Sequence, residues 1–153
     1  MANEAYRAVF LRVHPTGKMV LSLTTDSDGK ESEYAALVAS ELGVPALDVK
    51  VVSADTDRFG IGHGYNTSPS PGAAAAIGHA TTKIRDKARL LAGMALEAAP
   101  EGLTWSSGAW VSGDGSDPTQ VKTIEDIALY AHGTGELPPG VEGGLDAQSV
   151  YTD

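Results

Sequence analysis

The sequence predicts one α+β domain, a two-layer fold in which a mixed sheet carries two main helices on one face, in the order β-β-α-β-α-β. Residues 5–13 and 19–24 alternate between apolar and polar side chains closely enough to form half-buried strands. From Ser32 onward the apolar residues instead recur at helical spacing, and a second helical segment follows a short apolar run. Because each helix has one apolar face, placing both helices on the same side of the sheet buries these faces most simply.

In the first half of the chain, a hairpin is followed by a helix and a buried strand. Residues 14–18 (His-Pro-Thr-Gly-Lys) have the composition of a turn and join the first two strands. The first helix runs from Ser32 to Leu42, because Gly43 favours the left-handed conformation that ends helices and Pro45 prevents continuation. Residues 49–52 are apolar enough to form a buried strand.

An alanine-rich segment, residues 72–98, predicts the second and longer helix. Ser70 is available as its N-cap, and Pro71 suits its first turn because proline has no amide hydrogen to donate. Four apolar residues define its expected buried face: Ile77, Ile84, Leu91 and Ala95.

The remaining elements are shorter. Residues 103–106 and 109–112 flank a Ser-Gly turn and predict a second hairpin. Residues 123–131 predict a small helix, in which Thr123 and Asp126 have the spacing of an acidic capping box.

The chain is expected to divide into a compact module and a tail. Residues 1–132 contain all of the predicted elements. Residues 133–153 are rich in glycine and proline and have no hydrophobic period, so they predict an extended tail that docks on a partner chain.

Composition excludes several classes of function. The 153 residues carry a net charge of −9, and an acidic surface repels nucleic acids and anionic membranes. The chain has no cysteine, so it forms no disulfide, thiolate metal site or iron–sulfur cluster of its own. Because no stretch approaches the roughly 18 uncharged apolar residues of a membrane span, we expect a cytoplasmic protein.

Five segments follow one another at spacings that match a known family. They are 41–45 (Glu-Leu-Gly-Val-Pro), 49–52, 55–57 (Asp-Thr-Asp), 62–64 (Gly-His-Gly) and 72–76 (Gly-Ala-Ala-Ala-Ala). In these segments the chain resembles the middle part of the large, molybdopterin-binding subunit of the xanthine dehydrogenase, aldehyde oxidase and carbon monoxide dehydrogenase family. The resemblance implies the fold of a molybdenum cofactor-binding domain. It also implies that the chain is one module of a much longer subunit.

The resemblance implies that a loop before each main helix holds a molybdopterin-type molybdenum cofactor, which is shared with partner chains. Backbone N–H groups at helix N-termini suit the anionic pyrophosphate of such a cofactor. Asp28 stands where the family has a glutamine, and Asn66 stands where it has an arginine; both changes weaken anion binding. The expected cofactor-binding residues are Asp28, Gly29, Ser32, Gly64, Tyr65, Asn66 and Thr67.

We therefore expect a small subunit or fragment of a hetero-oligomeric, molybdenum hydroxylase-like oxidoreductase that acts on a small-molecule substrate. The resemblance implies that the glutamate acting as general base lies near the far C-terminus of the large subunit, beyond the segment matched here. No catalytic residue is assigned to this chain. Two alternatives remain open: a non-catalytic structural subunit that has lost the cofactor, which Asp28 and Asn66 favour, and a repurposed scaffold with different, non-redox chemistry.

The loop between the third strand and the long helix contains two further groups of polar residues. Asp55, Asp57 and His63 are of the types that bind a divalent cation, but aspartates that cap backbone groups in a turn explain them better. Ser68 and Ser70 lie near His63 in the sequence, yet no nucleophile-elbow motif accompanies them. We predict neither a metal site nor a hydrolytic site here.

Three more groups have a structural interpretation that we favour. His79 lies near Lys83 on the long helix, where a role in packing or at the surface is more common than proton transfer. His132 lies at a helix end, where it interacts with the helix dipole. Trp105 and Trp110 flank the second hairpin turn and are expected to cover a sheet edge or a subunit contact rather than form an exposed binding patch.

Overall fold

A computed structural model describes residues 8–24, 29–53, 72–133 and 137–151. Its main sheet has four strands in the order β3-β2-β1-β7. β1 pairs antiparallel with both β2 and β7, whereas β2 and β3 are parallel, so the sheet is mixed as predicted. The four strands are β1 (Ala8–Val13), β2 (Met19–Leu23), β3 (Val49–Ser53) and β7 (Asp146–Val150).

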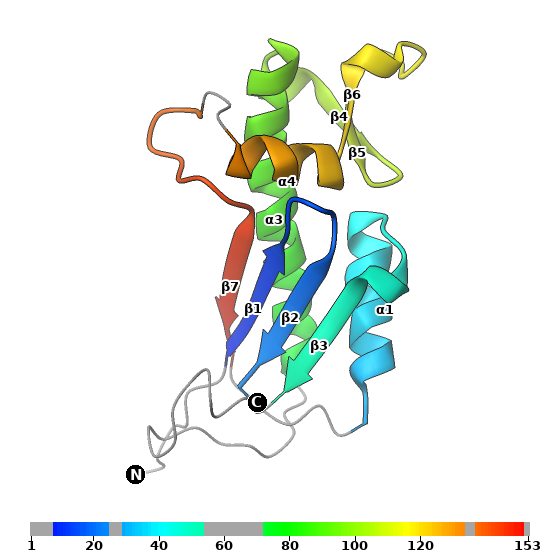
Figure 1. Ribbon diagram of the computed structural model, residues 1–153, viewed down its shortest axis with the longest axis vertical. Helices are drawn as coiled ribbons and strands as arrows, with labels where there is room; N and C mark the ends of the chain where they lie inside the picture. The colour runs from blue at the N-terminus through cyan, green and yellow to red at the C-terminus, as the bar shows by residue number, and fades with distance from the viewer. Residues whose placement is uncertain (1–7, 25–28, 54–71, 134–136, 152–153) are drawn as a thin grey trace.

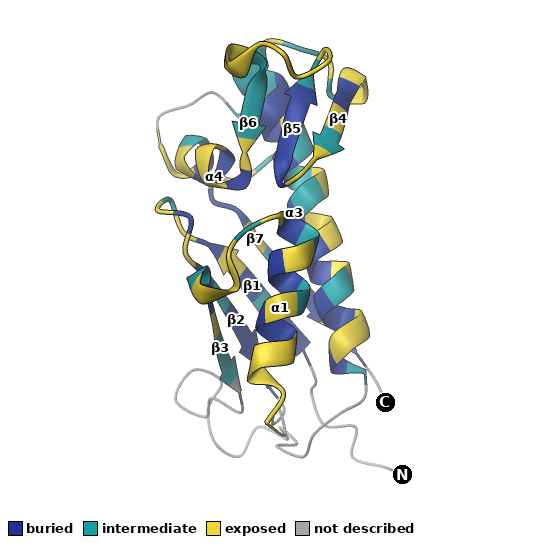
Figure 2. Cartoon of the chain, turned by 90° about the vertical axis from the view of Figure 1, so that its right-hand side faces the viewer, coloured by how far each residue is buried: buried dark blue, intermediate teal, exposed yellow. Residues whose placement is uncertain are grey.

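Two helices cover one face of this sheet and form the second layer of the fold (Figure 1). Helix α1 (Glu31–Leu42) packs on β3, and helix α3 (Ala73–Leu96) packs on β1 and β7. The side view in Figure 2 shows both helices on the same side of the sheet. The predicted α+β fold class is therefore confirmed.

The core lies between the sheet and the two helices. Alternate residues of β1 and β2 point into it and are buried, which is the period-2 pattern that predicted these strands. On α3 the predicted apolar face is buried at Ile77, Ile84 and Leu91, while Ala95 near the helix end is only half-buried.

The structure confirms the predicted end of α1 and the predicted start of α4, but not the predicted N-cap of α3. Gly43 has φ +68° and closes α1, as expected from its conformational freedom. Helix α4 (Ile124–His132) has the predicted capping box, because the side chains of Thr123 and Asp126 each accept a hydrogen bond from the other residue's backbone N–H. At α3 the prediction of Ser70 as N-cap was wrong: the N-cap position is Gly72, and Ser70 and Pro71 lie outside the described residues.

A smaller sheet lies beside the C-terminal half of α3 (Figure 1). Its strands pair antiparallel in the order β4-β5-β6. The hairpin β4-β5 was predicted, but β6 was not, because its three residues are too few to show a period. The bounds are β4 (Leu103–Ser106), β5 (Ala109–Ser112) and β6 (Val121–Thr123), and short 3-10 turns cover Ala46–Asp48, Pro100–Gly102 and Pro118–Gln120.

Trp105 and Trp110 attach the small sheet to α3. The rings form an edge-to-face pair across β4 and β5, with centroids 5.3 Å apart. The indole Nε1 of Trp110 donates a hydrogen bond to the backbone oxygen of Arg85 at 3.0 Å. The guanidinium groups of Arg85 and Arg89 lie 5.5 and 5.2 Å from the centroids of Trp105 and Trp110. These tryptophans therefore form an internal contact of this chain rather than an exposed patch.

Part of the predicted tail belongs to the main sheet. Residues 146–150 form β7, which pairs with β1 at the sheet edge, and Leu145 is completely buried. The sequence predicts no strand here, since the segment Asp-Ala-Gln-Ser-Val has little hydrophobic pattern. The backbone of β1 supplies the hydrogen bonds that hold the strand in place. Docking of residues 133–153 on a partner chain stays a prediction.

No helix within the described ranges is long and apolar enough to cross a membrane.

Candidate functional site

The two main helices begin at the same end of the module, where β2 and β3 have their C-terminal ends (Figure 1). α1 starts at Glu31 and α3 starts at Ala73, and neither helix has a side-chain N-cap. A helix N-terminus carries a partial positive charge, and its first backbone N–H groups have no hydrogen-bond acceptor within the helix. This end of the module therefore offers two sets of donors to an anion.

The structure describes two of the seven predicted cofactor-binding residues, and both lie at the start of α1. Gly29 is exposed in a left-handed conformation (φ +74°), and no heavy atom lies within 4 Å of the position of a Cβ there. Ser32 is exposed in the first turn of α1. The other five lie outside the described residues: Asp28, Gly64, Tyr65, Asn66 and Thr67.

A hollow of about 320 Å³ lies against the first two turns of α3. The helix contributes small residues and one imidazole to it, and the C-terminal strand contributes the opposite side. His79 is exposed there, one helical turn beyond Ala75, so its side chain lies on the same helix face as the hollow. The lining residues are Gly72, Ala75, Ala76, His79, Val150 and Tyr151.

From the sequence, His79 is expected to serve in packing or at the surface, and Tyr151 has no predicted role in a site. The sequence does indicate that His79 and Ala75 share a helix face, since residues four apart lie on the same side of a helix. The position of Tyr151 could not be predicted from the sequence, because it depends on the pairing of β7 with β1.

A second hollow, of about 350 Å³, lies beside α1. Its walls are the first turns of α1, the turn at Ala46 and Leu47, and the edge strand β3. Ser32 lines it, as does Leu47, whose side chain is 97% exposed.

The two helix starts differ in their fit to an anionic group. The first turn of α3 contains no acidic residue, and its small side chains leave room for close approach to the backbone. The first turn of α1 carries Glu31 and Glu33, whose carboxylates repel an anion. The described residues therefore fit a phosphate-bearing group at α3, and they fit it less well at α1.

Other charged and polar groups have structural roles. The Nζ of Lys83 donates to the backbone oxygen of Gln148 at 2.7 Å, so it ties α3 to β7 rather than assisting His79. Hydrogen bonds from Ser116 lower the pKa of Asp114, and hydrogen bonds from Thr119 lower the pKa of Asp117. Both aspartates lie in the loop after β5, at the opposite end of the molecule from the helix starts.

The described residues contain no cluster of three His, Cys, Asp or Glu side chains that could hold a metal ion. Asp55, Asp57 and His63 lie outside the described residues, as do Ser68 and Ser70. His132 lies in the last turn of α4, where the dipole interaction was expected.

This α+β fold is shared with a class of cofactor-binding domains. The chain belongs to the molybdopterin cofactor-binding domain family, whose model matches residues 1–153. Among individual proteins, it is 37% identical over 145 residues to the carbon monoxide dehydrogenase large chain of Hydrogenophaga pseudoflava and 35% identical over 147 residues to that of Afipia carboxidovorans. Each match covers 92% of this chain and 17% of the relative.

Similarity to a solved structure agrees with the sequence comparison. The reconstituted carbon monoxide dehydrogenase from Oligotropha carboxidovorans matches with a TM-score of 0.79 and 30% sequence identity. The match covers 96% of this chain and 18% of that one. The chain thus spans about a sixth of the length of the relatives it matches, and the resemblance to the xanthine dehydrogenase and carbon monoxide dehydrogenase family is confirmed.

Proposed function

We propose that this chain is a cofactor-binding module of a multi-subunit, molybdenum hydroxylase-like oxidoreductase, to which it contributes the loops before α1 and α3. The observation that carries this proposal is the start of α3, which has no side-chain N-cap and is lined by small residues, in a chain of the molybdopterin cofactor-binding domain family. The partners are the other segments and subunits of the complex, the substrate is a small organic molecule, and the location is cytoplasmic.

The residues of this chain bind and orient the cofactor. At α3, backbone N–H groups of the first turn donate to a phosphate oxygen, and His79 faces the same hollow. At α1, Gly29 allows close approach of the backbone, and the Ser32 hydroxyl is a further donor. The bound cofactor supplies the redox chemistry. Asp28, Gly64, Tyr65, Asn66 and Thr67 complete the proposed site, which relies on backbone donors more than on charge.

One described feature favours the alternative of a structural subunit that has lost the cofactor. Glu31 and Glu33 place two carboxylates in the first turn of α1, next to the sequence position of Asp28. The two carboxylates of this turn, with a third acidic residue close by in the sequence, oppose the binding of a pyrophosphate there.

Metal and pterin content of the purified complex distinguishes the two functions. The chain is purified with its natural partners, and molybdenum is measured by elemental analysis and pterin by fluorescence. We expect one molybdenum for each copy of the chain. A stable complex that contains neither molybdenum nor pterin would contradict the proposal and support the structural subunit.

A matched pair of variants tests the role of α3. Ala75→Glu places a carboxylate in the hollow, and Ala74→Glu places one on the adjacent residue, which is also exposed but does not line the hollow. Both changes suit the helix dipole, so both variants should fold. We expect Ala75→Glu to lower the molybdenum and pterin content about tenfold or more through charge repulsion, and Ala74→Glu to lower it much less. Equal content in the two variants would show that the cofactor does not bind at this hollow.

A further inference from the structure

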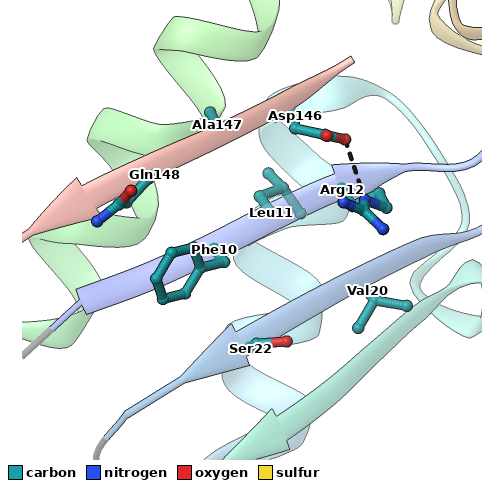
Figure 3. A pocket seen from close by; sticks show the side chains of 8 residues that line it. All are labelled: Phe10, Leu11, Arg12, Val20, Ser22, Asp146, Ala147 and Gln148. Carbon is teal, nitrogen blue, oxygen red and sulfur yellow. Dashed lines mark hydrogen bonds and ion pairs between the residues drawn. The ribbon is translucent and has the colours of Figure 1, made fainter. Parts of the chain in front are cut away.

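The second face of the main sheet carries a hollow of its own. α1 and α3 cover the inner face, and no helix of the described residues covers the outer one (Figures 1 and 2). On the outer face, β1, β2 and β7 surround a hollow of about 410 Å³, drawn in Figure 3. The side chains that matter are Phe10, Arg12, Val20, Ser22, Asp146 and Gln148.

The lining of this hollow combines an apolar surface with polar ends. The half-buried side chains of Phe10 and Val20 give it apolar walls. Arg12 and Asp146 form an ion pair at one end, with Nε and Oδ1 3.3 Å apart, and both side chains are largely exposed to solvent. Such an apolar centre with a polar rim is typical of a protein–protein contact surface.

Ser22 provides an independent observation. Ser22 is only 1% exposed, and it lines the hollow. Within the described part of the chain, no residue hydrogen-bonds its hydroxyl. Because buried hydroxyl groups in folded proteins nearly always have a partner, this hydroxyl points to a hydrogen-bonding group that comes from outside the module.

The lengths of the relatives show that a large chain of this family has other segments that could supply that group. This chain matches 17% of a large chain, so about five-sixths of such a chain lies outside the module. We propose that the hollow is the docking site of another segment of the same large chain, which places an apolar side chain between Phe10 and Val20 and a hydrogen-bonding group on Ser22. This inference rests on the proposed function, since it takes the module to be part of a molybdenum hydroxylase-like large chain.

Accessibility of a single cysteine tests the docking. The chain has no cysteine, so Val20→Cys places a unique thiol in the hollow. Thr104→Cys is the control, because Thr104 is exposed on a strand of the small sheet. Each variant is treated with iodoacetamide, once as the 153-residue chain and once in the complex purified from the source organism, and the labelled peptide is quantified by mass spectrometry.

We expect the labelling rate at position 20 to fall about tenfold or more in the complex, while the rate at position 104 changes much less, because thiol reactivity follows exposure. Equal labelling of position 20 in the two samples would overturn the proposal. Protection in the 153-residue chain by itself, together with a dimeric mass in sedimentation, would identify a second copy as the occupant and would also overturn it.

Ser22→Ala adds a second test, because the change should affect the melting temperature of the isolated chain and that of the complex differently. In the isolated chain the change removes a buried hydroxyl without a partner, so the melting temperature should stay the same or rise. In the complex the change removes a hydrogen bond, so the melting temperature should fall. A fall in both samples would overturn the proposed role of Ser22.

The outcomes for the docking and for the proposed function remain separable. Molybdenum is measured on the same complex. A molybdenum-containing complex in which position 20 reacts freely would overturn only the docking, whereas a complex without molybdenum would overturn the proposed function whatever the labelling shows.

Discussion

Two glycines allow the end of α1 to lie against the turn between β4 and β5. Gly43 and Gly108 both have positive φ, +68° and +85°. A Cβ on Gly43 would overlap the Cα of Gly108, and a Cβ on Gly108 would lie 2.7 Å from the backbone oxygen of Gly43. Only glycine at both positions permits this contact, which connects the helix layer to the small sheet.

Gly43→Ala should therefore lower the free energy of unfolding by about 2–4 kcal/mol, the sum of the left-handed conformational cost and of overpacking against backbone. The measurement is urea unfolding followed by circular dichroism. Gly113→Ala is the matched control, since Gly113 also has positive φ (+79°) but no heavy atom within 4 Å of a Cβ. It should lose only about 1–2 kcal/mol. Equal losses in the two variants would show that the contact with Gly108 contributes nothing.

At the scale of elements, Trp110 contributes more than Trp105 to holding the small sheet against α3. Trp110 is 8% exposed and donates its indole hydrogen to the backbone of α3. Trp105 is half-buried and packs against Trp110 and the guanidinium of Arg85. Arg85 in turn lies 3.5 Å from the carboxylate of Glu41, which links α3 to α1.

Trp110→Ala should destabilise the chain by about 3–5 kcal/mol, because it removes a large buried side chain from between the small sheet and α3. Trp110→Phe keeps an aromatic ring and loses the hydrogen bond to Arg85, so its cost should be nearer 1–2 kcal/mol. Urea unfolding measures both values, and near-ultraviolet circular dichroism reports whether the Trp105 environment changes. A similar cost for the two variants would mean that packing by Trp110 does not hold the small sheet.

At the scale of the whole molecule, the C-terminal segment completes the fold. Its strand β7 lies at one edge of the main sheet, and β3 lies at the other. The backbone N–H of Val13 donates to the oxygen of Leu145 at 2.9 Å, just before β7 begins. The Leu145 side chain is completely buried in the core.

Leu145→Ala should lower the free energy of unfolding by about 2–5 kcal/mol through the cavity that it leaves. Leu129→Ala is the control, because the Leu129 side chain is 61% exposed, and its cost should be within about 0.5 kcal/mol. Thermal and urea unfolding give both values. If Leu145→Ala were as harmless as the control, the C-terminal segment would not be part of the cooperative unit.

Local patterns predicted the elements that contain enough residues to show a period. The hairpin of β1 and β2, both main helices and the α4 capping box follow from alternation, helical spacing and the Thr123–Asp126 pair. β6 and β7 were missed because three and five residues with few apolar side chains resemble a loop. The candidate site was predicted from family resemblance, and its described part consists of Gly29 and Ser32, to which the structure adds the hollow at His79.

The sequence by itself determined the fold class, the end of α1 at Gly43 and the membership of the molybdopterin cofactor-binding domain family. These depend on neighbouring residues or on matched spacings along the chain. Only the tertiary structure decided that β7 pairs with β1, that two helix starts gather at one end, and that Ser22 faces a hollow on the outer side of the sheet. Residues 12 and 146 are 134 positions apart, and backbone pairing over that distance uses groups that every residue carries, so no local pattern encodes it.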